Sequence, residues 1–167
     1  MYRTEIETAF ADVFDQAIVF HGFADYMRDH DIYIYATADP RTGIQPEHLR
    51  YRFKHCVVAK AVTAVPPAIW KNSLDERLID YAQGRDLNGH VRGVGWQVLY
   101  PGFKLSSDSA DAQRWSKELG IAFYEATAET NGHNLTLVFA DLVVETVEPG
   151  VAPFVVPSGG PDVKIPL

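Results

Sequence analysis

The sequence predicts an α+β protein that is mainly antiparallel β, in which two related β–connector–β–β units pack as a sandwich or open barrel with two to four covering helices. Three observations favour this fold: alternating Ile, Val, Tyr and Phe residues recur along the chain, two Asn-Gly pairs mark tight turns, and four blocks of the first half reappear in order in the second. We expect one domain over residues 1–150, with repeat units at about 13–65 and 92–148, a helical linker at 66–91 and an extended C-terminal arm at 151–167.

The composition excludes several classes of protein. The 167 residues are 47% apolar and carry a net charge of −7, so the chain is neither disordered nor broadly basic like a nucleic-acid or membrane-surface protein. No apolar run approaches the roughly 20 residues that span a membrane, and the N-terminus does not resemble a secretory signal. A single cysteine, Cys56, excludes an internal disulfide and a thiolate zinc cage, and its apolar surroundings predict a buried small hydrophobe. We expect a cytoplasmic protein.

The first elements are a helix and a strand. Apolar residues at helical spacing predict a helix over residues 4–17, with Thr4 as N-cap and Glu7 completing a capping box. Residues 16–23 are dense in β-branched and aromatic side chains and can equally form a strand. Residues 31–39 form a clear strand of Ile and Tyr.

A turn at residues 39–43, with Asp, Pro and Gly, leads into an extended run at 49–65. This run first alternates apolar with basic residues and becomes nearly all apolar past His55. We expect a strand that bends or moves from a sheet edge toward its centre. The pair Pro66-Pro67 ends it, because proline cannot donate to the ladder.

The second half repeats this alternation of helices and strands. We expect one or two short helices in the linker, with Ser73 as an N-cap, and a hairpin at Asn131-Gly132. The remaining predicted elements are a strand at 90–100, a helix at 108–119 capped by Asp108 and closed by Gly120, and strands at 121–129 and 133–147.

The internal repeat rests on four pairs of blocks in the same order. Any two β-rich stretches share some alternation, which is the alternative explanation, but the shared Gly-Phe and Ala-Thr-Ala-acid motifs favour a duplication. Two such units would bury their apolar faces against each other about a pseudo-two-fold axis. The matched blocks are 17–23 with 97–103, 26–35 with 115–124, 36–39 with 126–129, and 53–58 with 139–144.

The densest polar cluster, Arg28-Asp29-His30-Asp31, directly precedes the Tyr-rich strand. An Asp–His pair can orient an imidazole as a general base, and the cluster could also hold an anion or a metal. The repeat places Lys117-Glu118 opposite Arg28-Asp29, which favours a structural ion pair at a strand entrance. His30 has no counterpart in the second copy and is therefore the member most suited to a specialised role.

Other candidate residues are His21, Tyr33 and Tyr35. His21 lies at a strand end beside a glycine, a position compatible with a pocket rim or with a histidine bonded to backbone. Tyr33 and Tyr35 share one strand face and form either a pocket wall or, more in keeping with their type, a core wall. The six histidines include no close pair, and phosphate-loop and nucleophile-elbow motifs are missing, so we expect no metal site and no cofactor.

Three motifs carry a resemblance to a known family: HGF with YMRD at residues 21–29, LDxRLxDYxxG at 74–84, and NGHNLTLVFxDL at 131–142. Over roughly residues 12–157 the chain resembles the uncharacterised YxiG-like domain family of bacteria. The resemblance implies a small bacterial cytoplasmic protein, sometimes encoded near toxin systems, and it transfers no catalytic residue.

The sequence assigns no reaction and favours a non-enzymatic protein-interaction module, with an immunity-like role as one form and a basic protein as partner. The alternative is a small-molecule-binding protein or enzyme, whose pocket between the units would be lined by Arg28, Asp29, His30, His21 and Tyr35. A homodimer formed through the C-terminal arm is a third hypothesis. The candidate pocket or interaction residues are His21, Arg28, Asp29, His30, Tyr33 and Tyr35.

Overall fold

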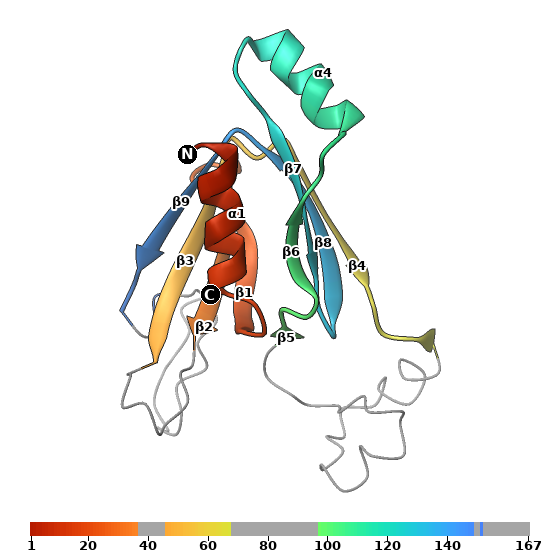
Figure 1. Cartoon of the computed structure of the whole chain (residues 1–167). Helices are drawn as coiled ribbons and strands as arrows, with labels where there is room; N and C mark the ends of the chain where they lie inside the picture. Colours follow the sequence, from red (N-terminus) through yellow and green to blue (C-terminus); the bar gives the residue numbers. More distant parts are fainter. Residues whose placement is uncertain (37–45, 68–96, 149–150, 152–167) are drawn as a thin grey trace, which may run out of the picture.

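The computed structural model describes residues 1–36, 46–67, 97–148 and 151, which form two antiparallel sheets and the helices α1 (Arg3–Asp12) and α4 (Ala110–Leu119) (Figure 1). The first sheet has the order β5-β1-β2-β3-β9 and the second the order β4-β8-β7-β6. Its strands are β5 (Gln97–Val98), β1 (Ala17–Ala24), β2 (Asp29–Ala36), β3 (Glu47–Lys54) and β9 (Asp141–Thr146). Those of the second sheet are β4 (Val58–Thr63), β8 (His133–Phe139), β7 (Tyr124–Glu129) and β6 (Gly102–Leu105).

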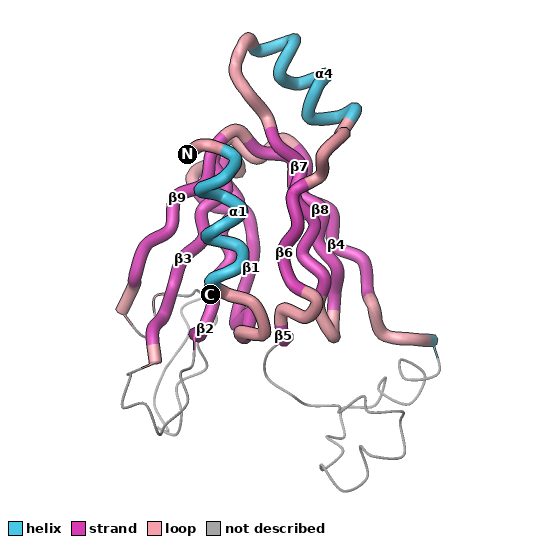
Figure 2. Tube along the Cα trace, viewed as in Figure 1, coloured by secondary structure: helices cyan, strands magenta, loops and turns pink. Residues whose placement is uncertain are grey.

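The predicted α+β class and the predominance of antiparallel β structure are confirmed, and Figure 2 shows how the strands outweigh the helices. The two sheets do not join into one closed barrel. Several predictions fall outside the described residues: the turn at 39–43, nearly all of the linker at 66–91, the first part of the strand at 90–100, and the arm beyond residue 151.

Helix α1 begins earlier and ends earlier than the sequence predicts. Its N-cap is Tyr2 rather than Thr4, and the carboxylate of Glu5, not Glu7, accepts the Tyr2 backbone N–H at 2.6 Å. Ile6 and Phe10 are buried, as their helical spacing predicts. The chain then leaves the helix early enough for β1 to start at Ala17, which confirms the strand alternative for this stretch.

The long extended run predicted at 49–65 consists of two strands in different sheets. β3 ends at Lys54, His55 takes a left-handed conformation with φ of 51°, and β4 begins at Val58 in the second sheet. The predicted strand at 133–147 breaks in the same way, because β8 ends at Phe139 in the second sheet and β9 begins at Asp141 in the first. The second sheet therefore contains β4 from the first half of the chain, and the first sheet contains β5 and β9 from the second half.

The two crossing points lie against each other. The Ala140 N–H donates to the Lys54 carbonyl at 2.9 Å, and the Val57 N–H donates to the Val138 carbonyl at 2.8 Å. These bonds satisfy backbone groups at the places where the strands change sheets.

Helix α4 and the following hairpin agree closely with the sequence. Ser109, rather than the predicted Asp108, is the N-cap, and its hydroxyl accepts the Ala112 N–H at 3.0 Å. Gly120 closes the helix with φ of 69°, as predicted. β7 and β8 form the predicted hairpin around Asn131-Gly132.

One core lies between the two sheets. Ile32 and Tyr51 face it from the first sheet, Leu137 from the second, and Phe10 from α1. A smaller cluster, in which Phe123 and Val138 are buried, lies beneath α4. Because strand residues alternate between faces, this core fixes which side chains of β2 point inward and which point outward.

Candidate functional site

His21 and His30 lie side by side on the inner face of the first sheet and line the same cavity, which we call the histidine cavity. Their ring centroids are 5.6 Å apart, on strands β1 and β2. The cavity has a volume of about 180 Å³ and lies between β1 and β2 on one side and β4 and β8 on the other. The remaining lining residues are Gly22, Phe23, Ala59, Lys60, Ala61, Leu135 and Leu137.

Burial disfavours the charged form of both imidazoles. Burial lowers the pKa of His30 to about 4, with a further lowering by the neighbouring His21. Burial also lowers the pKa of His21, and electrostatic interaction with His133 lowers it further. Three buried nitrogen atoms have no hydrogen-bond partner: both ring nitrogens of His30 and the Nδ1 of His21. The cavity thus holds polar groups whose hydrogen bonds are unmet among the described residues.

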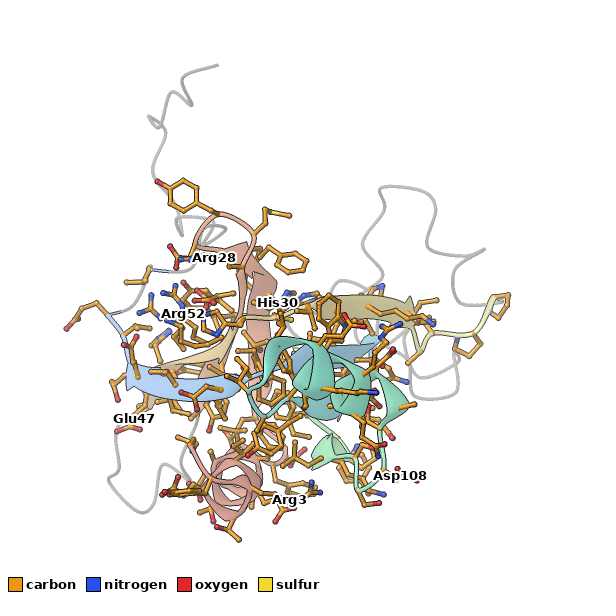
Figure 3. All side chains as sticks on the ribbon, turned by 90° about the horizontal axis from the view of Figure 1, so that it is seen from above. Arg3, Arg28, His30, Glu47, Arg52 and Asp108 are labelled. Atoms are coloured by element: carbon orange, nitrogen blue, oxygen red, sulfur yellow. The ribbon has the colours of Figure 1, made fainter. Side chains whose placement is uncertain are left out.

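Asp29 and Asp31 belong to the opposite face of the same strand. The Asp31 carboxylate accepts two hydrogen bonds from the Arg52 guanidinium, each at 2.8 Å, and the pKa of Arg52 is raised by this contact. Asp29 accepts the His55 backbone N–H at 2.9 Å and lies 3.7 Å from the Lys54 ammonium. In Figure 3, Arg52 and His30 accordingly lie on opposite sides of β2.

The ion pair predicted between Arg28 and Asp29 is not formed. Arg28 instead donates to the Asp25 carboxylate at 3.0 Å, within the turn between β1 and β2. Asp29 is the first residue of β2 and pairs with Lys54, so this strand entrance holds a structural ion pair with a partner other than Arg28.

Tyr33 and Tyr35 share one face, as predicted, but that face points away from both the core and the histidine cavity. Tyr33 is buried against Phe20, with ring centroids 6.1 Å apart, and its hydroxyl lies 3.5 Å from Asp31. Tyr35 packs against His48 with ring centroids 5.0 Å apart. Of the six candidate residues, only His21 and His30 converge.

Arg28 lines a second and larger hollow, which we call the α4 groove. It has a volume of about 520 Å³ and lies at the α4 end of the molecule, where the β1–β2 turn, the β3–β4 turn and the end of α4 meet (Figure 1). Sequence reasoning missed this site because its apolar residues come from three distant segments and no motif connects them. The lining residues are Met27, Arg28, His55, Cys56, Val57, Leu119, Ile121 and Phe123.

The β1–β2 turn beside this groove has an unusual backbone. Asp25, Tyr26 and Met27 have φ values of 51°, 59° and 66°, so three successive residues other than glycine are left-handed. This conformation costs about 1 to 2 kcal/mol per residue for side chains with a Cβ. Tyr26 is 94% exposed and Met27 69% exposed, so burial of these side chains does not offset the cost.

Cys56 forms part of the groove floor and is buried, as the sequence predicts. Its thiol donates to the Val58 carbonyl at 3.1 Å, and burial raises its pKa to about 12. The thiol therefore stays protonated at neutral pH and acts as a small apolar side chain.

In the part of the chain that the structure describes, no three His, Cys, Asp or Glu side chains are grouped so that they could hold a metal ion. Neither α1 nor α4 has the length and apolar character needed to cross a membrane.

No curated protein and no solved structure matches the chain. The family described as YxiG-like protein matches residues 3–157, which is nearly the whole chain and includes both sheets, the histidine cavity and the α4 groove. The chain therefore belongs to the YxiG-like protein family.

Proposed function

We propose that this chain is a non-enzymatic protein-interaction module that binds its partner at the α4 groove. The observation that carries the proposal is the left-handed turn of Asp25, Tyr26 and Met27, which holds two large apolar side chains in solvent at a cost in free energy. Backbone strain of this kind clusters at functional sites. Recognition of another protein is a function that exposed apolar side chains serve directly.

The surroundings of the turn support the same proposal. Leu119 and Ile121, at the end of α4, are 54% and 47% exposed and border the groove opposite Met27. These three side chains form an apolar rim, and Phe123 lies in the groove between them and the core beneath α4. A partner that inserts one apolar side chain into the groove would bury this rim, as anchor residues do in protein interfaces.

The charge of the chain favours a basic partner. The residues outside the described ranges contain equal numbers of acidic and basic side chains, so the described part carries the whole formal charge of −7. A charge of this sign steers a basic protein toward the surface and speeds association. An immunity-like role in the bacterial cytoplasm, in which this chain captures a basic toxin, is one form of the proposal.

The scaffold is consistent with an internal duplication, which we also propose. β1, β2 and β3 form consecutive strands of one sheet before β4 crosses over, and β6, β7 and β8 do the same before β9 crosses back. Phe53 and Phe139, matched in the predicted repeat, touch with ring centroids 4.8 Å apart. The facing sheets would then be the two halves of an open sandwich related by a pseudo-two-fold axis.

A binding experiment tests the interaction proposal. The full chain is co-expressed with the products of its neighbouring genes, and complexes are measured by size-exclusion chromatography and calorimetry. Replacing Tyr26 and Met27 together by serine should weaken binding at least about ten-fold, the effect expected when interface anchors are lost. The control replaces Tyr2 and Val62 by serine in the same way. These side chains are 79% and 50% exposed and do not line the groove, so the affinity for the partner should stay unchanged.

Two results would overturn the proposal: no neighbouring product forms a complex, or the Tyr26/Met27 variant binds as tightly as the control. Self-association through the arm at 151–167 is tested separately, by comparing the mass in solution of the full chain with that of a chain ending at residue 149. A dimer that becomes a monomer on truncation would assign the arm that role.

A further inference from the structure

The space between the two sheets is closed differently at its two sides. Helix α1 closes the side between β9 and β6: the Met1 ammonium pairs with Asp141 of β9, and the Arg3 guanidinium donates to the Ser106 carbonyl, next to β6, at 3.1 Å. The other side, between β1 and β4, contains the histidine cavity. Phe23, which is 40% exposed, stands among its lining residues and marks the side that faces solvent.

Inside this cavity, His30 has no hydrogen-bond partner although it is only 5% exposed. A neutral imidazole has one N–H donor and one acceptor nitrogen, so it needs a partner for each. The buried Nδ1 of His21 also lacks a partner, 5.6 Å away between ring centroids. The two rings therefore have three nitrogen atoms without hydrogen-bond partners. Together they can bind a ligand group that both donates and accepts a hydrogen bond.

The rest of the lining is apolar. Leu135 and Leu137 of β8 face Ala59 and Ala61 of β4 in the hydrogen-bonded ladder, and Phe23 lies edge-on to His30 with ring centroids 5.1 Å apart. Strand alternation directs the side chain of Lys60 to the opposite face of β4. No acidic residue belongs to the described lining. Such walls favour an uncharged ligand, because a buried charge would lack a counter-ion.

The size of the cavity limits the ligand further. A volume of about 180 Å³ is close to the ~150 Å³ of an apolar protein cavity that holds a benzene molecule. We propose that the histidine cavity binds an uncharged single-ring compound whose hydroxyl group bonds to His30 and His21. Phenol is the simplest member of this class: its ring contacts Phe23, Leu135 and Leu137, and its hydroxyl both donates to and accepts from the imidazoles.

Comparing the affinities of phenol and toluene distinguishes a site with hydrogen-bonding groups from a purely apolar cavity. Both are titrated into the ¹⁵N-labelled full chain, and the ring nitrogens of the histidines are followed by NMR at pH 7.5. Phenol should shift the signals of His21 and His30 in a saturable way. Toluene, which has the same shape without the hydroxyl donor and acceptor, should bind about ten-fold more weakly, the effect of losing one or two neutral hydrogen bonds.

Three variants complete the test, each first checked for an unchanged fold by its amide spectrum. His30→Leu should lose the preference for phenol while retaining toluene binding, and Ala61→Phe should fill the cavity and abolish binding of both. His48→Gln, a matched control on the outer face beside Tyr35, should bind phenol like the wild type. The proposal is overturned if phenol gives no saturable shift, if toluene binds equally well, or if Ala61→Phe leaves the phenol titration unchanged.

Discussion

Phe53 and Phe139 meet edge to face, with ring centroids 4.8 Å apart and planes 86° apart, next to the points where β3 and β8 end and the chain changes sheets. Both rings are completely buried. This contact joins the two halves of the chain at the place where each half passes a strand to the other.

A double-mutant cycle at this contact should reveal coupling. Phe53→Leu and Phe139→Leu remove an aromatic pair worth about 0.5 to 1.5 kcal/mol beyond its buried area, so the two losses should be non-additive by that amount in urea unfolding. Phe53→Leu combined with Phe123→Leu, which lies in the cluster under α4, provides the control and should be additive. Additivity in both cycles would contradict a specific role of the contact.

The ion pair of Asp31 with Arg52 should contribute to stability. Asp31→Asn leaves Arg52 without its bidentate partner, and the Asp31 side chain is 3% exposed. Because Arg52 is 25% exposed, we expect a loss of about 2 to 3 kcal/mol, less than the 3 to 5 of a fully buried pair. Glu145→Gln breaks the more exposed pair with Arg50 and should cost less than about 1 kcal/mol in the same unfolding assay.

The stability of the protein should fall in mild acid because of His30. Its pKa is about 4 in the folded chain and about 6.5 when unfolded, so between these values the unfolded chain binds more protons. The free energy of unfolding therefore has its full value above about pH 6.5. It decreases by up to about 3 kcal/mol as the pH falls toward 4. Urea unfolding at pH 7.5 and 5 measures this change.

The variant His30→Leu provides the comparison for this pH dependence. It should remove most of the decrease between pH 7.5 and 5, whereas His48→Gln should not. An unchanged slope in His30→Leu would show that other groups cause the acid sensitivity.

We expect the left-handed turn to favour partner binding and to lower the stability of the fold. Met27→Gly relieves a conformation that costs about 1 to 2 kcal/mol and adds the entropy loss of glycine, so the free energy of unfolding should rise by up to about 1 kcal/mol. The same substitution removes an exposed side chain of the groove and should weaken partner binding. Ala61→Gly, in the regular strand β4, should instead lower stability.

Cys56 should react slowly with thiol reagents. Its side chain is buried and its pKa is raised to about 12, so at pH 8 the folded chain contains almost no accessible thiolate. Labelling with a chromogenic disulfide reagent should be fast in urea and much slower in its absence. Equal rates in both conditions would contradict the buried position.

Much of the secondary structure could be predicted because local signals specify it. Gly120 ends α4 with a φ of 69°, a backbone conformation that glycine adopts easily. Asn131 and Gly132 lie in the loop of the β7–β8 hairpin, where the Asn-Gly signal predicts them. The strand crossings at His55 and Ala140 could not be predicted, because apolar alternation continues across them and does not say which sheet a strand joins.

The candidate site was predicted only in part for a similar reason. His21 and His30 face each other because a hairpin joins β1 to β2, yet its left-handed residues Asp25, Tyr26 and Met27 include no glycine and so give no turn signal. Without that hairpin, the inward face of His30 and the outward face of Asp29 and Asp31 cannot be assigned. The structural role that the sequence favours for the acidic residues of the cluster agrees with their ion pairs to Arg52 and Lys54, but the partners could not be named.

The exchange of β4 and β9 between the sheets also sets an order in time. During synthesis, β1, β2 and β3 leave the ribosome early, but β3 gains its second neighbour, β9, only when residues 141–146 have emerged. In the second sheet, the outer strand β4 is synthesised before any other strand of that sheet. The nascent chain must therefore hold β3 without its neighbour β9, and β4 without its strand partner β8, until residues 133–146 have been made.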